Sequence, residues 1–214
     1  FCSVEQRELC GGYDGAQATL SYTDTGSSAE DTVTNNGYVT VGVGSDEARW
    51  QYSIDGGDTW LDGSGSGFAL SEGTYRAGYV KVRQTDLAGN VSAATSLGAI
   101  RVDTSVTGPS GSYTDSGVSG DHTTNDGQIN VTLSSDVASW QYSTDGGAHW
   151  ITGSGTAFEL DDGIYTSVEV RQTDVAGNVS EAQNLGPITV DTRGPSIVGV
   201  VLSGSDGALN GRLN

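Results

Sequence analysis

The stretch RWQYSIDGGDTW at residues 49–60 returns as SWQYSTDGGAHW at residues 139–150. Trp50 and Trp140 are ninety positions apart in the sequence, and so are Trp60 and Trp150. In each copy apolar residues alternate with polar ones and then reach Asp-Gly-Gly, a pattern typical of a strand that ends in a tight hairpin. A hairpin that returns at a fixed distance predicts tandem copies of one β-rich unit.

Three further motifs recur in the same order: VRQTDLAGNVS (82–92) as VRQTDVAGNVS (170–180), SYTDTG (21–26) as SYTDSG (112–117), and IRVDT (100–104) as ITVDT (188–192). They define two repeats, over residues 14–104 and 105–192. Residues 193–214 resemble the linker and first strand of a third unit, and residues 1–13 match nothing in the repeat. We therefore expect the chain to be a slice of a longer tandem array.

Each repeat is expected to contain about seven short antiparallel strands. In the first repeat these are predicted near residues 17–23, 37–43, 48–54, 58–61, 67–70, 75–85 and 96–103. Seven such strands in about ninety residues predict an all-β fold of tandem immunoglobulin-like β-sandwiches. Trp50 and Trp140 are the expected core tryptophans, and Tyr75 and Tyr165 stand where such sandwiches place a tyrosine corner.

The charge balance excludes two classes of partner. The chain has 27 acidic residues against 9 Lys and Arg, a formal net charge of −18. Binding to nucleic acid or to an anionic membrane surface requires a basic face, which this composition does not supply. No apolar run approaches the roughly 20 residues of a membrane-spanning helix, so direct membrane insertion is not expected either.

Both cysteines lie in the first ten residues. Cys2 and Cys10 are spaced for a small local disulfide, which we expect if the chain is secreted into an oxidising compartment. A metal site there is less favoured, because neither a histidine nor a third cysteine is near.

The repeated motifs resemble the bacterial immunoglobulin-like repeats of giant, type I-secreted (RTX-type) adhesins and biofilm-associated surface proteins. The resemblance rests on W-x-Y-S-x-D-G-G-x-x-W, V-R-Q-T-D-x-A-G-N-x-S, V-D-T and an Asp-rich loop, and it covers roughly residues 14–195. It implies an extracellular, cell-surface rod with Ca²⁺ bound between domains. The cysteine-bearing segment and the linker at 193–195 depart from the family pattern.

Asp and Asn residues form the candidate metal sites. Calcium prefers six to eight oxygen ligands from carboxylates, amides and carbonyls. Alternating strand directions place the A–B loop and the end of strand G of one sandwich beside the F–G loop of the next. The expected ligands at the junction of the two repeats are Asp24, Asp31, Asn35, Asp103, Asp174 and Asn178. The alternative is that these residues only form turns.

The same reasoning predicts two incomplete sites at the outer ends of the pair of repeats. Asp115, Asp121 and Asp191 would face a following domain. Asp86 and Asn90 would face a preceding one, whose acidic residue is represented by Asp14.

No catalytic site is predicted. Residues 53–60 fit the sialidase Asp-box, which we interpret as a structural hairpin. A glycosidase needs two carboxylates across a cleft, whereas these Asp residues recur at turns in both copies. His122 and His149 are replaced by Thr32 and Thr59 in the other repeat.

The leading hypothesis is a calcium-rigidified spacer that holds a distal binding module away from the cell. Its partners are the neighbouring repeats, while host or biofilm glycans and proteins are expected to contact other domains. One alternative is a filament or S-layer subunit that assembles by strand addition through residues 197–202. Another is a glycan- or protein-binding module that uses exposed tyrosines such as Tyr13, Tyr38 or Tyr79.

Overall fold

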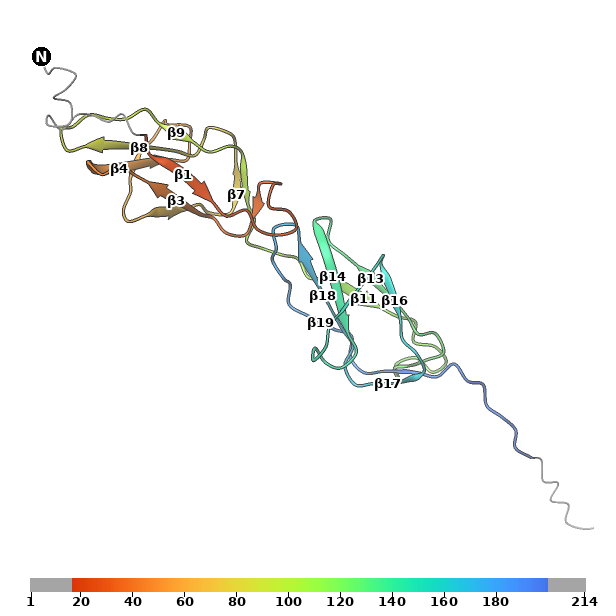
Figure 1. Ribbon diagram of the computed structural model, residues 1–214. Coiled ribbons are helices and arrows are strands. Elements are labelled where there is room, and N and C mark those ends of the chain that lie inside the picture. The colour runs from red at the N-terminus through yellow and green to blue at the C-terminus, as the bar shows by residue number, and fades with distance from the viewer. Residues whose placement is uncertain (1–16, 200–214) are drawn as a thin grey trace, which may run out of the picture.

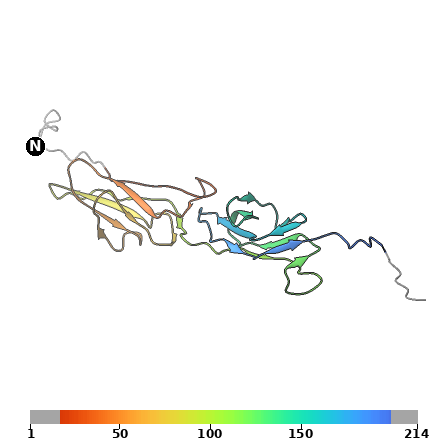
Figure 2. The same ribbon diagram turned by 90° about the horizontal axis from the view of Figure 1, so that it is seen from below.

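The computed structural model describes residues 17–199. They form two lobes joined end to end, the first from red to yellow-green and the second from green to blue (Figure 1). The view turned by 90° shows the same elongated arrangement (Figure 2). All regular elements of the described residues are strands, so the all-β fold class is confirmed. The described residues also contain no helix long and apolar enough to cross a membrane.

The first lobe contains ten short strands: β1 (Thr19–Tyr22), β2 (Val33–Thr34), β3 (Tyr38–Gly42), β4 (Glu47–Ser53), β5 (Leu61–Asp62), β6 (Gly67–Ala69), β7 (Gly73–Tyr75), β8 (Lys81–Asp86), β9 (Thr95–Ser96) and β10 (Ile100–Val102). The second lobe repeats them in order: β11 (Ser110–Ser112), β12 (Thr123–Thr124), β13 (Gln128–Thr132), β14 (Val137–Ser143), β15 (Ile151–Thr152), β16 (Ala157–Glu159), β17 (Gly163–Tyr165), β18 (Glu169–Asp174), β19 (Gln183–Asn184) and β20 (Ile188–Val190).

Three sheets build each lobe. In the first lobe the sheet β1-β3-β6 faces the sheet β5-β4-β8-β9, and a third sheet, β2-β10-β7, lies at the end where the chain leaves the lobe. The second lobe has the same three sheets. Strand alternation explains the packing, because β3 reads YVTVG and buries only its two valines.

One hydrophobic core lies between the sheets of the first lobe. Val39 and Val41 of β3 meet Trp50 of β4 and Val82 of β8 there. Trp50 is 4% exposed, as is Trp140 in the second lobe, so both lie in the core as predicted. Phe68 stacks on Tyr52 with ring centroids 4.1 Å apart, beside Trp50.

Each lobe has ten short strands where about seven were expected, and the structure corrects three of the predicted strands. The strand expected at 58–61 is reduced to β5, because residues 54–60 form the turn of the hairpin. The strand expected at 75–85 is divided into β7 and β8, which belong to different sheets, because the chain turns at Gly78 with φ of 78°.

The strand expected at 96–103 is divided into β9 and β10, because residues 97–99 form no strand and carry the chain from one sheet to another. β9 completes the sheet of β8, and β10 then crosses to β7 and pairs in parallel with β2.

Both tyrosine corners are present. The Tyr75 hydroxyl donates to the Ser71 carbonyl at 3.0 Å, and the Tyr165 hydroxyl donates to the Asp161 carbonyl at 3.0 Å. Each bond reaches back along β7 or β17 to the turn that follows β6 or β16, a few residues upstream of the tyrosine, as in immunoglobulin-like sandwiches. The cysteines, Asp14 and residues 200–214 lie outside the described residues, while residues 191–199 are described and form no strand.

Candidate metal centre at the junction of the two sandwiches

The loop between β1 and β3 of the first sandwich docks onto the loop after β18 of the second. The Ser27 amide donates to the Val175 carbonyl at 3.1 Å, and the Thr25 hydroxyl donates to the Ala176 carbonyl at 3.0 Å. Gly26 lies so close to this loop that a Cβ at its position would be 2.1 Å from the Val175 oxygen. The glycine therefore permits the close approach of two backbones.

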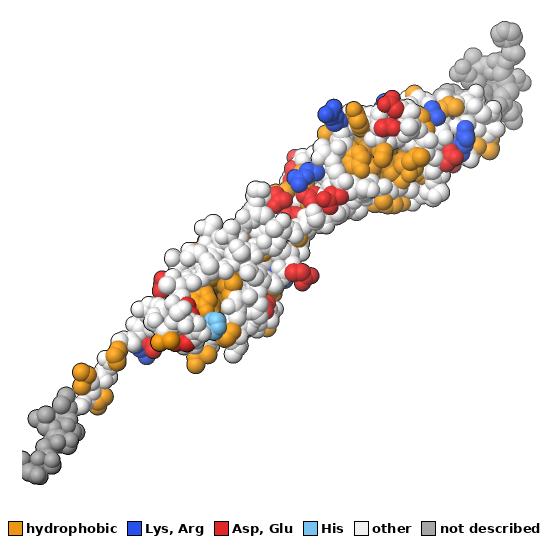
Figure 3. All heavy atoms as spheres, turned by 180° about the vertical axis from the view of Figure 1, so that it is seen from behind, with side chains coloured by type: hydrophobic (Ala, Val, Ile, Leu, Met, Phe, Trp, Pro, Cys, Tyr) orange, Lys and Arg blue, Asp and Glu red, His pale blue; other side chains and the backbone are white. Residues whose placement is uncertain are grey.

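Three carboxylates meet at this junction. Asp103 follows β10 of the first sandwich, whereas Asp136 precedes β14 and Asp174 ends β18 of the second. One oxygen atom from each lies within 4.8 Å of the others. Asp103 is 5% exposed and Asp174 is fully buried. Acidic side chains also gather on the surface at the narrowing between the lobes (Figure 3).

The donor set fits a hard cation such as calcium. Calcium–oxygen bonds are about 2.4 Å long, so two ligands of one ion lie at most about 5 Å apart. The three carboxylates supply oxygen only, which is the ligand type that calcium prefers. Carboxylates this close repel one another unless a cation lies between them.

The cluster is held by hydrogen bonds from its own loops. Asp174 accepts bonds from the backbone and side-chain nitrogens of Asn178, both at 2.8 Å. The side-chain amide of Asn178 also donates to the backbone carbonyl of Asp103 at 2.8 Å, and this bond crosses the junction. Asp136 accepts a bond from the Ser134 hydroxyl at 2.6 Å. These contacts fix the carboxylates of Asp174 and Asp136 before any ion arrives, which lowers the entropic cost of binding an ion.

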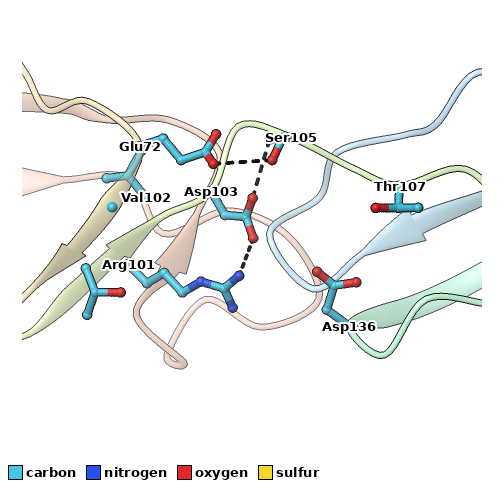
Figure 4. A pocket seen from close by; sticks show the side chains of 9 residues that line it. Glu72, Arg101, Val102, Asp103, Ser105, Thr107 and Asp136 are labelled. Carbon is cyan, nitrogen blue, oxygen red and sulfur yellow. Dashed lines mark hydrogen bonds and ion pairs between the residues drawn. The ribbon is translucent and has the colours of Figure 1, made fainter.

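A shallow pocket of about 220 Å³ opens beside the cluster. Asp103 and Arg101 enter it from the first sandwich and Asp136 from the second, with the linker running across (Figure 4). Arg101 Nη2 is 2.6 Å from Asp103 Oδ2. The pocket thus gives solvent a path to the carboxylates, which an ion would need.

Of the six residues predicted for this junction, Asp24 and Asp31 lie outside the group of three carboxylates. Asp24 accepts a bond from the Thr32 amide at 3.0 Å, and Asp31 accepts one from the Val33 amide at 3.0 Å. Both carboxylates hold their own loop, in which Thr32 has a φ of 63°. The Asn35 side-chain oxygen is likewise used by the Thr25 hydroxyl. The cluster of carboxylates therefore includes Asp103 and Asp174 but not Asp24 or Asp31.

Asp136 was missed by the sequence reasoning. A signal was present, because Ser-Asp stands before the core-tryptophan strand in both repeats, as Asp46 and as Asp136. The B–C loop that carries it lies at the same end of the sandwich as the F–G loop. The Val175 amide donates to the Asp136 carbonyl at 2.9 Å, which ties the two loops together.

The first sandwich repeats half of this site at its own N-terminal end. Asp86 accepts bonds from the backbone and side-chain nitrogens of Asn90 at 2.7 and 2.8 Å, and the Leu87 amide donates to the Asp46 carbonyl at 3.0 Å. The loop conformation is thus that of Asp174 and Asn178. Asp14, the expected counterpart of Asp103 at this end, lies outside the described residues 17–199.

The second sandwich repeats the other half at its C-terminal end. Asp115 accepts a bond from the Gly120 amide at 2.6 Å, and Asp121 accepts one from the Thr123 amide at 2.9 Å. Asp191 is exposed, whereas its counterpart Asp103 is buried against the second sandwich.

The Asp-box residues are used by their hairpin. The Asp55 carboxylate accepts bonds from the Thr59 hydroxyl at 2.5 Å and from the Ser53 hydroxyl at 2.7 Å. Asp145 and His149 form the corresponding pair in the second sandwich, with Nδ1 and Oδ2 2.6 Å apart. His122 bonds the Tyr113 hydroxyl at 2.9 Å, far along the chain from that pair. These contacts support the structural interpretation of the box.

Comparison with known proteins adds little to this description. No family model matches the chain, and no curated protein matches it significantly. A solved structure of the fibronectin(III)-like modules of Clostridium thermocellum CbhA aligns with a TM-score of 0.44 at 14% identity, covering 86% of this chain and all of that one. The assignment of immunoglobulin-like sandwiches rests on the strands, sheets and cores described above.

Proposed function

We propose that the two sandwiches are spacer repeats of an extracellular bacterial surface adhesin and that calcium stiffens the junction between them. The observation that carries the proposal is the group of three carboxylates from both sandwiches within 4.8 Å of one another. Because no single sandwich supplies all three, an ion there would bind only the docked arrangement. The resemblance of the repeats to adhesin and biofilm proteins supports the location and role.

The stiffening follows from linkage. An ion that binds only the docked state stabilises that state in proportion to the logarithm of its concentration over the dissociation constant. Without the ion, a few hydrogen bonds between loops hold the junction together. The mutual repulsion of Asp103, Asp136 and Asp174 opposes them. A rod of such joints would hold a distal module at a distance that depends on calcium. Such a role requires no catalytic group.

Isothermal titration of calcium into the 214-residue protein tests the proposal. Asp174→Asn removes one charged ligand of the junction and should weaken binding at least tenfold. Asp86→Asn is the matched control, because Asp86 is the counterpart of Asp174 in a loop that does not face the junction. Equal affinity in all three proteins, or no calcium binding to the parent, would contradict the proposal.

A second candidate function is assembly by strand addition. It is favoured by the segment after β20, where Ile197 and Val198 are 86% and 98% exposed. Apolar residues in an extended segment can complete the edge of a neighbouring sheet. Concentration-dependent polymerisation that is lost in a double variant, Ile197→Ser with Val198→Ser, would support this candidate over the spacer.

A further inference from the structure

Arg101 is a second charged group at the junction, and it lies against the carboxylate cluster. Its guanidinium is 2.6 Å from Asp103 Oδ2, one of the carboxylates proposed to bind calcium. The side chain of Asp103 is 7% exposed, whereas that of Arg101 is 46% exposed. Figure 4 shows the guanidinium pointing toward the Asp103 carboxylate, with Asp136 on the opposite side of the pocket. Arg101 can therefore leave Asp103 for solvent without disturbing the core.

The strand does not need an arginine at this position. The second repeat has Thr189 there, in the sequence ITVDT against IRVDT. Thr189 pairs with Thr123 and Ile164 in the same register in which Arg101 pairs with Val33 and Thr74. The cation near the corresponding end of the second sandwich, Arg193, pairs with Asp162 instead of Asp191. Only the inner junction of the described residues thus has an arginine on its aspartate.

The charges explain what such an arginine does. Without a metal, three carboxylates share a small, partly buried space, and the guanidinium neutralises one of them. When a doubly charged ion binds the same carboxylates, the guanidinium becomes a like charge beside it. The ion and Arg101 therefore compete for Asp103.

We propose that Arg101 is a built-in counter-ion that occupies Asp103 in the metal-free protein and yields it when calcium binds. Arg101 thereby stabilises the junction at low calcium and raises the calcium concentration at which the junction stiffens. The inference rests on the proposed function, because it requires calcium at the cluster. It goes further by giving the inner junction a calcium threshold different from that of a junction with threonine at this position.

The test compares the parent with Arg101→Thr, which introduces the residue of the second repeat, and with Arg193→Thr as the matched control. Calcium affinity is measured by isothermal titration. The binding heat that is lost in Asp174→Asn identifies the contribution of the junction site. Arg101→Thr should bind calcium roughly three- to tenfold more tightly, the size expected when a partly exposed ion pair no longer competes. Arg193→Thr should bind like the parent.

Melting in chelator supplies a readout that does not depend on binding heat. Arg101→Thr should melt below the parent in chelator, because its carboxylates have lost their counter-ion, and saturating calcium should remove the difference. If Arg101→Thr does not fold, Arg101→Gln keeps the length of the side chain without its charge. Circular dichroism verifies the fold of each variant.

The outcomes separate the two proposals. If the parent and Arg101→Thr bind calcium equally, the counter-ion role is overturned and the proposed calcium junction stands. Weaker binding by Arg101→Thr also overturns it, since Arg101 would then position Asp103 for the ion. If neither protein binds calcium, both the proposed function and this inference fail.

Discussion

At the scale of the residue, the core tryptophans depend on glycines opposite them. A Cβ at Gly63 would lie 2.2 Å from the Trp50 indole, and one at Gly153 would lie 2.2 Å from the Trp140 indole. The tryptophans were identifiable from the sequence, because they recur within an alternating strand. The glycines were not, because a Gly after a hairpin is also what a turn would require.

Truncating the core tryptophan should destabilise its sandwich strongly. Trp50→Ala removes a large buried aromatic side chain and should cost about 3–5 kcal/mol of unfolding free energy, with Trp140→Ala similar. Urea denaturation measures the change. A variant that unfolds like the parent would show that the tryptophan contributes little to the core.

Filling the space opposite the tryptophan should also destabilise. Gly63→Ala forces a methyl group into the Trp50 ring and should cost about 1–3 kcal/mol, as other overpacked cores do. Gly98→Ala is the control, since no atom lies within 4 Å of a Cβ there and its φ is not in the left-handed region. Equal stability of the two variants would mean that Trp50 can shift freely.

At the scale of the element, the Asp-box hairpin should be sensitive to acid. Hydrogen bonds from the Thr59 hydroxyl and amide, and then from Ser53, hold the Asp55 pKa well below its usual value of 3.8. The folded state therefore favours the charged carboxylate. Its stabilising effect is present above the pKa of the unfolded chain and is lost as the pH falls below about 4 and through the lower folded pKa.

We predict that the melting temperature of Asp55→Asn falls less steeply with acid than that of the parent. Its melting temperature should be lower than that of the parent near neutral pH, and the gap should narrow as the pH falls below about 4. Scanning calorimetry from pH 2 to 7 measures the melting temperatures of both proteins. Asp58→Asn, in the same hairpin, is the control, and the difference between its melting temperature and that of the parent should stay constant with pH. A gap in Asp55→Asn that is constant with pH would rule out this role for the carboxylate.

The docking loop gives an internally controlled prediction about the junction. Gly26 and Gly117 occupy equivalent positions with φ of 91° and 74°, but only Gly26 meets the backbone of the other sandwich. Gly26→Ala and Gly117→Ala therefore share the cost of a left-handed alanine, and only the first should disturb the docking. Residual dipolar couplings should report a changed angle between the sandwiches in Gly26→Ala alone. The same angle in both variants would show that this contact does not orient them.

The sequence could predict the hairpins and the order of strands but not which sheet each strand joins. Alternation within YVTVG indicates which side chains are buried, since it depends only on neighbouring residues. The crossing of the chain between β9 and β10 depends on pairing with β2, which is distant in sequence. A strand of two residues such as Val33–Thr34 leaves no periodic signal, so the third sheet could not be anticipated.

At the scale of the whole molecule, the alternating directions of successive strands predicted which loops would meet at the junction. The contacts of Ser27 with Val175 and of Asn178 with Asp103 lie where that reasoning put them. The reasoning did not identify which carboxylates would lie together, because that depends on the hydrogen bonds inside each loop. Asp24 and Asp31 accept bonds from their own loop and lie outside the cluster, while Asp136, from the B–C loop, belongs to it.

The most direct test of the calcium junction is small-angle X-ray scattering with calcium and with chelator. We expect calcium to narrow the distribution of interdomain distances in the parent and to leave it unchanged in Asp103→Ala, whose two sandwiches should stay folded. Asp191→Ala, the counterpart at the outer end, should respond like the parent. Profiles that are identical with calcium, with chelator and in Asp103→Ala would contradict the account, and the aspartates would then be residues that only shape their loops.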